Sequence, residues 1–477
     1  MSPHAVTEQF QDEELLASFN VTNNGFLPSE EPLKFLPNSY YEPWELLIHN
    51  LQSHLANGTL RQKVDQLPVL STEGLRAEPE WRRAYVILTL LTHSYVWGGD
   101  KAAEVRSQPF VQPRKPDVSR HGPVLINISW QILPPTLSIP LLAISQHLEV
   151  PPVATYAALN LWNFSSSTDC FTDLDSLKSP HTFTGTEDES WFLCVSVAME
   201  AQGAYIMPMM LKALRAIHTR DYDTIAASLD ELSVCIRKVG VLLDRMRERC
   251  DPMVFYHKIR PFLAGSMNMA AAGLPKGLFY DEGNGQGSWQ QWRGGSNGQS
   301  SLIQFWDVVL GVTHTSDGSN NPHSKGGKPE EKSFHQEVRE YMPGGHRRFL
   351  EHIGRSGSIR SLAMMPTSGE KHARMQEAYA AATKTLTEFR NKHLGIVTTY
   401  IVVPSRKPWT ADAGKKAVNL ATLSTRQQNE KKDAGKNGAD KELTGTGGTA
   451  LLPFLKQARD DTLEAGQLVR ETAIAKR

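Results

Sequence analysis

The fold of this chain follows from one stretch of its sequence, Leu386-Thr-Glu-Phe389-Arg-Asn-Lys-His393-Leu-Gly-Ile396-Val-Thr-Thr-Tyr400. Its apolar positions, extended back toward the N-terminus, recur at spacings of 4 and 3 residues: Met375, Tyr379, Ala382, Leu386, Phe389, His393, Ile396 and Tyr400. A helix with about 3.6 residues per turn places all of them on one inward-facing stripe. The pattern therefore predicts a long buried helix that carries one titratable ring, His393.

An imidazole among apolar side chains needs either a hydrogen-bond partner or a metal ion. Taken alone, His393 is more often a satisfied core histidine, and that alternative stays open. A single histidine in aromatic surroundings, with no cluster of further ligands, is also what a b-type haem site needs.

Helical patterns dominate the rest of the chain. The segment 222–250 repeats apolar residues at spacings of 4 and 3, and charged residues lie between them. Helices are also predicted over 81–97, 140–147 and 200–217. The run Val397–Val403 is rich in β-branched residues, but its continuity with the preceding stripe favours a helix that ends at Pro404. The fold class predicted is all-α.

The apolar blocks suggest two domains. A polar stretch near 180–190 separates a small N-terminal helical domain, 12–182, from a large domain, 183–477. Residues 283–298 are predicted to be a flexible glycine- and asparagine-rich loop, 313–333 a surface insertion, and 405–448 a flexible loop. The following segment, 449–456, is expected to dock back as a helix.

Composition argues against several classes of partner. The 477 residues contain 51 Lys plus Arg and 51 Asp plus Glu, so no broad positive field exists for nucleic acid or an anionic membrane. No apolar run is long enough to span a bilayer, and the N-terminus does not resemble a secretory signal. The four cysteines form no CxxC pair, which indicates a reducing compartment. We expect a cytoplasmic protein, and a monomer, because no long apolar interface pattern stands out.

Two motifs invite a catalytic interpretation. Gly294-Gly-Ser296-Asn-Gly298 matches the letters of a GxSxG nucleophile elbow, but no strand pattern precedes it and no helix pattern follows at once, so a loop is predicted. Arg260 lies beside an apolar face that includes Phe255, where a guanidinium could grip a carboxylate. The alternative for Arg260 is a surface residue or a structural ion pair.

Several blocks, in this order along the chain, resemble the indoleamine 2,3-dioxygenase family of haem enzymes. They are Tyr95-Val-Trp97-Gly, Pro151-Pro-Val-Ala-Thr-Tyr156, Trp191-Phe-Leu-Cys-Val-Ser196-Val-Ala-Met-Glu200, Phe255-Tyr-His-Lys-Ile-Arg260, Gly294-Gly-Ser296-Asn-Gly-Gln-Ser-Ser301, Tyr341-Met-Pro-Gly-Gly-His346-Arg, His393-Leu-Gly-Ile-Val-Thr-Thr-Tyr400-Ile and Gly445-Thr446-Gly-Gly-Thr449. The resemblance runs from about residue 20 to 456.

The resemblance implies roles residue by residue. His393 resembles the proximal ligand of the haem iron, whereas His346 matches a family histidine that does not bind the iron. Arg260 matches the arginine that holds the substrate carboxylate, with Phe255 beside the indole. The remaining implied positions are Tyr156, Phe192 and Ser196 in the distal wall, Leu263 on the substrate side, Gly295 and Ser296 over the haem edge, and Thr446 in a mobile loop. Arg260, Ser196 and Phe255 are the implied catalytic residues, and Ser196, Gly295 and Ser296 also contact the haem.

Departures from the family bear on pocket volume and hence on affinity for tryptophan. Tyr256 stands where some relatives carry a second phenylalanine, Leu159 where some carry a small residue, and Leu193 where some carry an aromatic one. Insertions occupy about 99–126 and 313–333.

The implied activity is that of a haem b dioxygenase of the kynurenine pathway, which leads to NAD. It would insert both atoms of O2 across the indole C2–C3 bond of L-tryptophan to give N-formylkynurenine, with a reductant that keeps the haem ferrous. The matched distal positions offer no histidine or carboxylate base, so the protein would orient the substrate and exclude water. Two alternatives remain: a haem-binding sensor or signalling protein with little turnover, and a structural helical protein in which His393 is merely packed.

Overall fold

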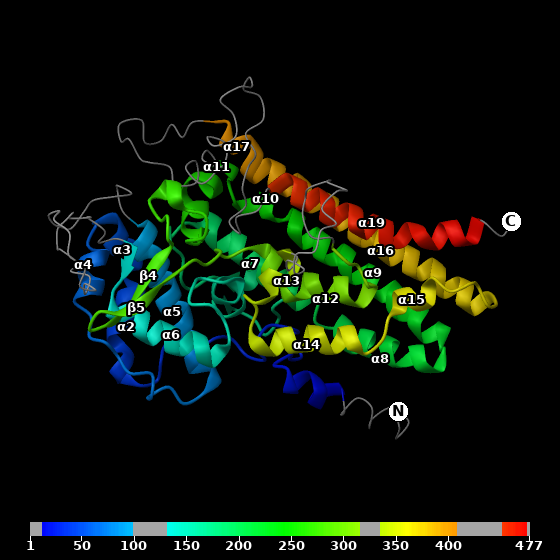
Figure 1. Cartoon of the computed structure of the whole chain (residues 1–477), viewed down its shortest axis with the longest axis horizontal. Coiled ribbons are helices and arrows are strands. Elements are labelled where there is room, and N and C mark those ends of the chain that lie inside the picture. The colour runs from blue at the N-terminus through cyan, green and yellow to red at the C-terminus, as the bar shows by residue number, and fades with distance from the viewer. Residues whose placement is uncertain (1–11, 99–130, 315–333, 408–450, 475–477) are drawn as a thin grey trace, which may run out of the picture.

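The computed structural model describes residues 12–98, 131–314, 334–407 and 451–474. Helices dominate these segments, which confirms the predicted all-α class (Figure 1). The α-helices are α2 (Glu42–His49), α3 (Leu51–Ala56), α4 (Leu60–Asp65), α5 (Glu78–Trp97), α6 (Pro135–Leu148), α7 (Glu187–Gln202), α8 (Ile206–Thr219), α9 (Tyr222–Asp244), α10 (Met246–Arg249), α11 (Pro252–Val254), α12 (Ser301–Leu310), α13 (Phe334–Arg339), α14 (Gly344–Arg355), α15 (Ile359–Ala363), α16 (Glu370–Val397), α17 (Val403–Ser405) and α19 (Leu451–Ile474). Shorter 3-10 or π turns are η1 (Ser39–Tyr41), η3 (Ala157–Leu161), η4 (Leu174–Ser176), η5 (Phe255–Ile259), η6 (Arg260–Leu263), η7 (Ala270–Ala272), η8 (Asn297–Gln299) and η9 (Thr398–Val402).

The predicted stripe lies on α16, the longest helix described. Its apolar side chains are buried, and α16 packs along both α9 and α19, which run beside it in Figure 1. The β-branched run after it is helical, as predicted, because a π turn, η9, continues α16 into α17. The predicted end was one residue short, because the helical segment continues past Pro404 to Ser405 in α17.

The helix predicted over 200–217 is wrong as a single element. It is the end of α7 followed by α8, and the two helices are bent by 41° at the break. Gly203 occupies the break, where a Cβ atom would come within 2.3 Å of Leu302 Cδ1. The close approach of α12 therefore requires a glycine here, and apolar periodicity does not reveal such an approach.

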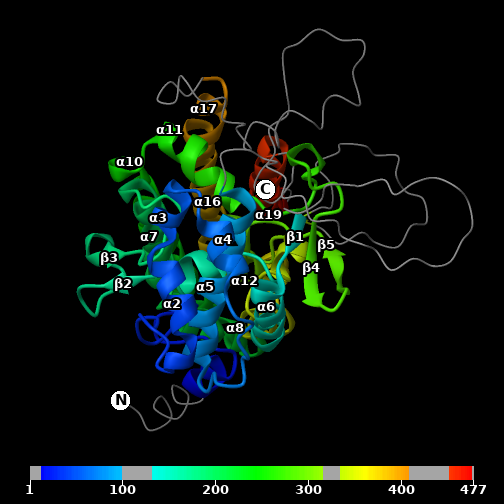
Figure 2. The ribbon, with the colours of Figure 1, turned by 90° about the vertical axis from the view of Figure 1, so that its left-hand side faces the viewer.

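The prediction of a loop over 283–298 is also wrong for the first half of this segment. Strands β4 (Leu278–Gly283) and β5 (Gln286–Gln290) form an antiparallel hairpin, and β1 (Ile132–Leu133) pairs in parallel with β4. Asn284 and Gly285 join the two strands with φ angles of 53° and 76°. An Asn-Gly pair favours these angles, so the sequence did contain a hairpin signal. Figure 2 shows this sheet beside α6 at one side of the molecule. A second small sheet pairs β2 (Ser165–Ser166) with β3 (Leu177–Lys178).

One contiguous apolar core extends across the predicted domain boundary near residue 182, from Leu16 to Ala465. Polar contacts cross it as well. Trp97 Nε1 donates to the carbonyl of Ala264 over 2.8 Å, and His93 Nδ1 lies 2.7 Å from the carbonyl of Phe262. The two-domain division stays a prediction.

Among the helices described, none by itself combines the length and hydropathy of a membrane span; the bent pair α7–α8 passes the test only when the two are joined.

Candidate active site

One cavity brings together every predicted site residue that the structure describes. Its lining includes Tyr156, Phe192, Ser196, Phe255, Arg260, Leu263, Gly295, Ser296 and His393. They come from the residue before η3, from α7, η5, η6, the loop before η8, and α16, so residues up to 237 positions apart in sequence (156 to 393) face the same space. Thr446 lies outside the described residues. The roles implied for these side chains stay predictions.

His393 faces this cavity from α16. Its ring is half-buried, and among the described residues no side chain or backbone group hydrogen-bonds to it. Burial, followed by the nearby charge of Arg390, lowers the pKa of His393 to about 4. The imidazole is therefore neutral near pH 7 and keeps a nitrogen lone pair available to a metal ion.

Arg260 begins η6 and is only 3% exposed. Burial lowers the pKa of Arg260, and the guanidinium carbon lies 5.5 Å from the centre of the Tyr256 ring. Beside it, Phe255 meets Phe192 edge to face at 4.9 Å between ring centroids. The site thus combines a buried cation with aromatic rings, which suits a planar substrate that carries a carboxylate.

A buried carboxyl group, Glu200 of α7, also lines the cavity. The hydroxyls of Tyr156 and Ser300 both donate to its Oε1, over 3.0 and 2.6 Å. Its Oε2 has no hydrogen-bond partner among the described residues. Burial raises the pKa of Glu200 to about 7 despite these two hydrogen bonds. The matched distal positions Tyr156, Phe192 and Ser196 contain no carboxylate, but Glu200 is a further acid in the lining that the sequence reasoning did not single out; an acid on an apolar helix face was the available signal.

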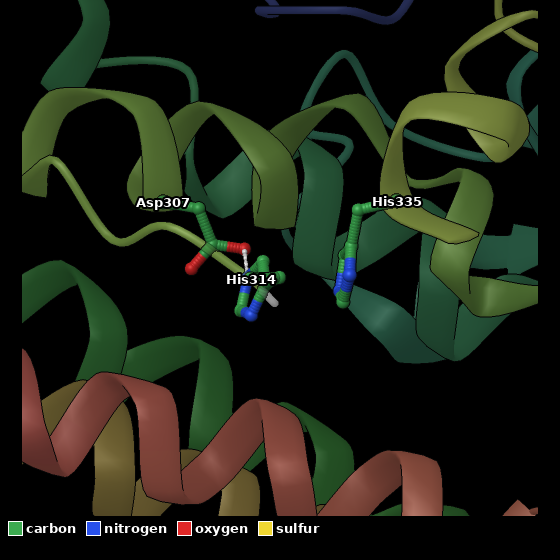
Figure 3. A group of neighbouring side chains, drawn as sticks. All are labelled: Asp307, His314 and His335. Carbon is green, nitrogen blue, oxygen red and sulfur yellow. Dashed lines mark hydrogen bonds and ion pairs between the residues drawn. The ribbon is translucent and has the colours of Figure 1, made fainter. Parts of the chain in front are cut away.

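A second polar group missed by the sequence analysis lies at another edge of the cavity. Asp307 at the end of α12, His314 just after it, and His335 in α13 lie close together (Figure 3). Asp307 and His335 both line the cavity. No regular spacing links the three residues, so only the fold brings them together.

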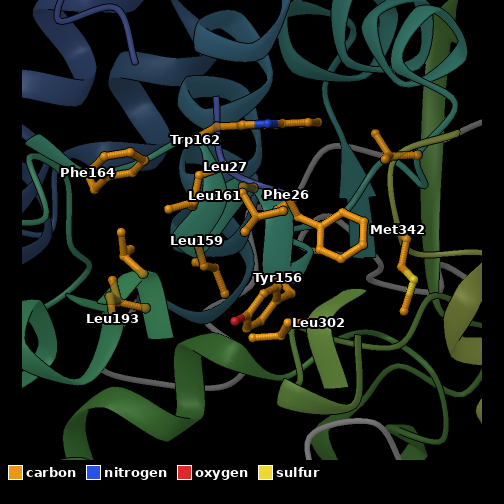
Figure 4. Close-up of a cluster of buried hydrophobic side chains, with 14 of the residues drawn as sticks. Phe26, Leu27, Tyr156, Leu159, Leu161, Trp162, Phe164, Leu193, Leu302 and Met342 are labelled. Carbon is orange, nitrogen blue, oxygen red and sulfur yellow. The ribbon is translucent and has the colours of Figure 1, made fainter. Parts of the chain in front are cut away.

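The apolar wall of the cavity explains why the Gly294–Gly295 pair is needed. A Cβ atom on Gly295 would lie 2.6 Å from Leu159 Cδ1, and one on Gly294 would lie 1.9 Å from the carbonyl oxygen of Leu263. Figure 4 shows Leu159 in this wall near Tyr156. The next residue, Ser296, accepts a hydrogen bond from the Gly298 amide and caps η8. Residues 291–296 form the predicted loop, and the hydroxyl of Ser296 serves the backbone there.

His346 occupies a different environment in α14. It is buried, its Nδ1 lies 3.1 Å from the Ser301 hydroxyl, and its ring packs 4.8 Å from that of Phe26. It does not line the cavity. His346 is thus a buried, hydrogen-bonded side chain of α14 that lies away from the cavity.

Comparison with known proteins gives a consistent result. The family described as "Indoleamine 2,3-dioxygenase" matches residues 15–465. An indoleamine 2,3-dioxygenase of Aspergillus nanangensis is 37% identical over 93% of this chain and 95% of its own length. The indoleamine 2,3-dioxygenase of Saccharomyces cerevisiae is 36% identical, covering 94% and 93%. A 6-hydroxytryptophan 2,3-dioxygenase of Fusarium equiseti is 33% identical, covering 93% and 95%.

A match over nearly the whole length, together with a cavity that gathers the family's motif residues, leads to one conclusion: this chain belongs to the indoleamine 2,3-dioxygenase family and is a dioxygenase.

Proposed function

We propose that this enzyme cleaves the indole C2–C3 bond of L-tryptophan with both atoms of O2 and releases N-formylkynurenine. The observation that carries the proposal is that His393 and Arg260 line the same cavity, with the ring of Phe255 also in its wall. A neutral imidazole suits an iron ligand, and a buried guanidinium suits the carboxylate of an amino acid.

Haem, on which the family depends in general, fits the residues of this cavity. The His393 ring has no competing hydrogen bond among the described residues, and apolar side chains of α16 and α19, such as Phe389 and Phe454, supply surroundings for a macrocycle. His393 would be the protein ligand of the iron. When bound in the ferrous state, haem supplies the dioxygen chemistry.

The protein's own contribution is orientation. Arg260 offers a fork of N–H donors that matches the two oxygens of a carboxylate. Phe255 and Phe192, in edge-to-face contact at 4.9 Å, present ring surfaces to the indole. When both ends of the substrate are held, its reacting carbons take up one orientation in the cavity. This lowers the entropic part of the activation free energy.

A second group of lining residues holds its polar side chains in place. Tyr156 and Ser300 are fixed on Glu200 by hydrogen bonds from their hydroxyls, and Ser196 lines the same cavity from α7. We assign to the Ser196 hydroxyl, which lines the cavity, the role of orienting the substrate's amino group or indole N–H. With Gly295 and Ser296 at its edge, the wall keeps bulk water away from the reacting carbons.

An aerobic assay of the reduced, haem-loaded protein tests this proposal directly. With L-tryptophan, absorbance of N-formylkynurenine should grow in proportion to enzyme and stop when O2 is removed. A protein that shows a haem spectrum but no product would instead be a haem-binding sensor or signalling protein. A protein that takes up no haem after supplementation would be a structural helical protein.

A substituted indole is the second candidate substrate, because the Fusarium equiseti relative is a 6-hydroxytryptophan 2,3-dioxygenase. Leu193, one of the departures from the family pattern, lines the cavity, and Tyr256, another, lies beside it with its ring centre 5.5 Å from the guanidinium carbon of Arg260. Competition between L-tryptophan and 6-hydroxytryptophan in one reaction gives the ratio of their kcat/KM values. If this ratio favours 6-hydroxytryptophan, that compound replaces L-tryptophan as the proposed substrate. The reductant, the monomeric state and the cytoplasmic location stay predictions.

A further inference from the structure

His314 lies between two carboxylate groups that belong to different helices. Its Nε2 lies 3.1 Å from Asp307 Oδ2 of α12 (Figure 3). Its Nδ1 lies 3.1 Å from Asp461 Oδ2 of α19. The side chains of His314, Asp307 and Asp461 are 7%, 4% and 5% exposed. One imidazole therefore joins α12 to α19 in a place that water barely reaches.

The two contacts require a charged ring. An ionised carboxylate only accepts hydrogen bonds, so both nitrogens of His314 must carry a proton if the ring is to bond to both carboxylates. Burial alone would raise the pKa of Asp307, but the charges of Arg390 and His314 outweigh it and lower that pKa well below its ordinary value. A neutral ring could donate to only one carboxylate and would turn a lone pair toward the other. The link between the two helices thus depends on one proton.

The other charged and titratable groups around His314 come from α13 and α16. Arg390 of α16 donates to Asp307 Oδ1 over 2.5 Å, which leaves Oδ2 to His314. Arg339 of α13 donates through its Nε to a glutamine side chain instead. His335, also of α13, stacks on His314 at 3.7 Å between ring centroids. Burial, and then the charge of His314, lower the pKa of His335 well below its usual value, so His314 is the ring of this pair that carries the charge.

Asp461 depends on His314 for its charged partner. Among the described residues, its other hydrogen-bond partner is Gln457, one turn earlier in α19, which donates to Oδ1 over 2.7 Å. His314 is the only cation in this part of the chain at ion-pair distance from Asp461. If His314 loses its proton, a buried carboxylate of α19 is left without a charged partner, which is costly in the interior.

α19 carries part of the cavity wall. Four of its side chains line the cavity: Leu451, Phe454, Leu455 and Ala458. Asp461 follows Ala458 by three residues, so it lies on the same side of the helix. The contact between His314 and Asp461 therefore holds in place a helix whose apolar side faces the space proposed for haem.

We propose that His314 is a proton-dependent clasp, in which the imidazolium between Asp307 and Asp461 keeps α19 closed against the cavity. When His314 loses its proton, α19 keeps its packing on α16 and the bond from Arg390 to the Ala458 carbonyl, but it loses its tie to α12, and haem leaves the cavity faster. This last step rests on the proposed function, because it takes haem as the occupant. Histidine normally loses its charge between about pH 5 and 8, so the clasp holds at the lower end of this range and opens at the upper end.

The rate of haem transfer from the full-length, haem-loaded protein to excess apomyoglobin measures how firmly the clasp holds. His314→Gln keeps a polar side chain that cannot be charged. At about pH 5.5 this variant should lose haem about 10-fold faster than the wild type, the factor that corresponds to one hydrogen bond to a charged group. At about pH 8.5 the two rates should converge, because the wild type has then lost the same charge.

The ratio of the two rates at each pH is the informative quantity, because Glu200, with a pKa of about 7, titrates in the same range in both proteins. Equal rates at the lower pH would overturn the clasp. A ratio that stays high and unchanged at both pH values would overturn it as well, since His314 would then act through its shape and not through its proton.

His147→Gln is the matched control. His147 of α6 pairs with Glu78 at the same 3.1 Å, and it does not line the cavity. The same substitution there should leave haem transfer at the wild-type rate. A comparable acceleration in His147→Gln would show that loss of any such pair loosens the protein, and would remove the special role of His314.

Asp461→Asn breaks the clasp from the other helix and covers the case in which His314→Gln fails to fold. It should accelerate haem transfer at the lower pH as His314→Gln does. The double variant should transfer haem no faster than either single one, because both changes remove the same contact. Accelerations that multiply in the double variant would place the two residues in separate roles and contradict the clasp.

Hydrogen exchange of α19 separates failure of the clasp from failure of the proposed function. In the haem-free, full-length wild type, the amides of residues 451–467 should be better protected at the lower pH, after correction for the intrinsic exchange rate. His314→Gln should show the weaker protection at both pH values. A protein that takes up no haem but shows this pattern keeps the clasp and loses the proposed function. A haem-loaded protein whose α19 shows no dependence on pH keeps the function and loses the clasp.

Discussion

The histidines of α14 and α16 show how two similar side chains serve different purposes. His346 and His393 both have a pKa lowered by burial, to about 3 and about 4. His346 lies 3.1 Å from the Ser301 hydroxyl and packs on Phe26. His393 has no hydrogen bond among the described residues and faces the cavity.

The difference shows that the partner of a buried ring, rather than its burial, indicates its role. Burial makes both imidazoles neutral, because a charge is costly in an apolar environment. A hydrogen bond then turns His346 into a structural link, whereas a lone pair left without one turns His393 into a candidate ligand. If so, loss of His346 affects stability, and loss of His393 affects what the cavity binds.

The largest expected effect is loss of haem in His393→Ala. With the proposed iron ligand gone, the purified variant should lack nearly all of its Soret absorbance, while its circular dichroism stays helical. His346→Ala is the matched control and should keep its haem. A normally loaded His393→Ala protein would transfer the ligand role to another residue and break the comparison.

Arg260→Ala tests substrate binding in the cavity that His393 faces, separately from haem binding. Loss of a charge-assisted pair with the substrate carboxylate costs about 2–5 kcal/mol. Since about 1.4 kcal/mol corresponds to a factor of ten, kcat/KM for L-tryptophan should fall about 30-fold to several thousand-fold. Steady-state kinetics at equal haem content measures this. Turnover within a factor of two of the wild type would remove Arg260 from the proposed role.

Glu200 extends the comparison from two histidines to the two oxygens of one buried carboxyl group. Its Oε1 is hydrogen-bonded, whereas its Oε2 has no partner among the described residues. Its pKa of about 7 lies above the ordinary 4.5, so the folded state binds its proton more tightly than the unfolded state. This contribution to stability is complete below about pH 4.5 and is lost as pH rises through 7.

Glu200→Gln keeps an oxygen that can accept from Tyr156 and Ser300 but does not titrate. Relative to the wild type, its free energy of unfolding should therefore rise between pH 4.5 and 7, by about 3 kcal/mol in all. Denaturant titrations at several pH values measure the difference. A constant difference across this range would show that Glu200 is ionised in the folded protein.

The smallest effect is expected for His346→Phe, which keeps the packing on Phe26 and loses the contact with Ser301. It should cost about 1–2 kcal/mol of unfolding free energy at pH 7. The folded pKa of His346 lies below the ordinary 6.5, so its contribution in the wild type weakens as pH falls below that value. The cost of the variant should therefore shrink toward pH 5, with haem content unchanged. If the His346→Phe protein lacked haem, the role of iron ligand would pass from His393 to His346.

Local pattern was enough to predict two of the long helices. The stripe from Met375 to Tyr400 and the repeat over 222–250 lie on long buried helices, because one period of the chain generates one apolar face. Periodicity failed where tertiary contacts interrupted it. The helix predicted over 200–217 is interrupted at Gly203, against which Leu302 of α12 packs closely. The hairpin at Asn284 was missed, although its Asn-Gly turn is a hairpin signal.

The sequence by itself determined the all-α class and, through its resemblance to a family, a set of candidate site residues centred on His393. Only the tertiary structure decided which polar groups share a cavity and which have partners. It brought Glu200 beside Tyr156 and placed Asp307, His314 and His335 together. The physical reason is that hydrogen bonding and burial depend on distances between segments remote in the chain, and no local periodicity encodes those distances.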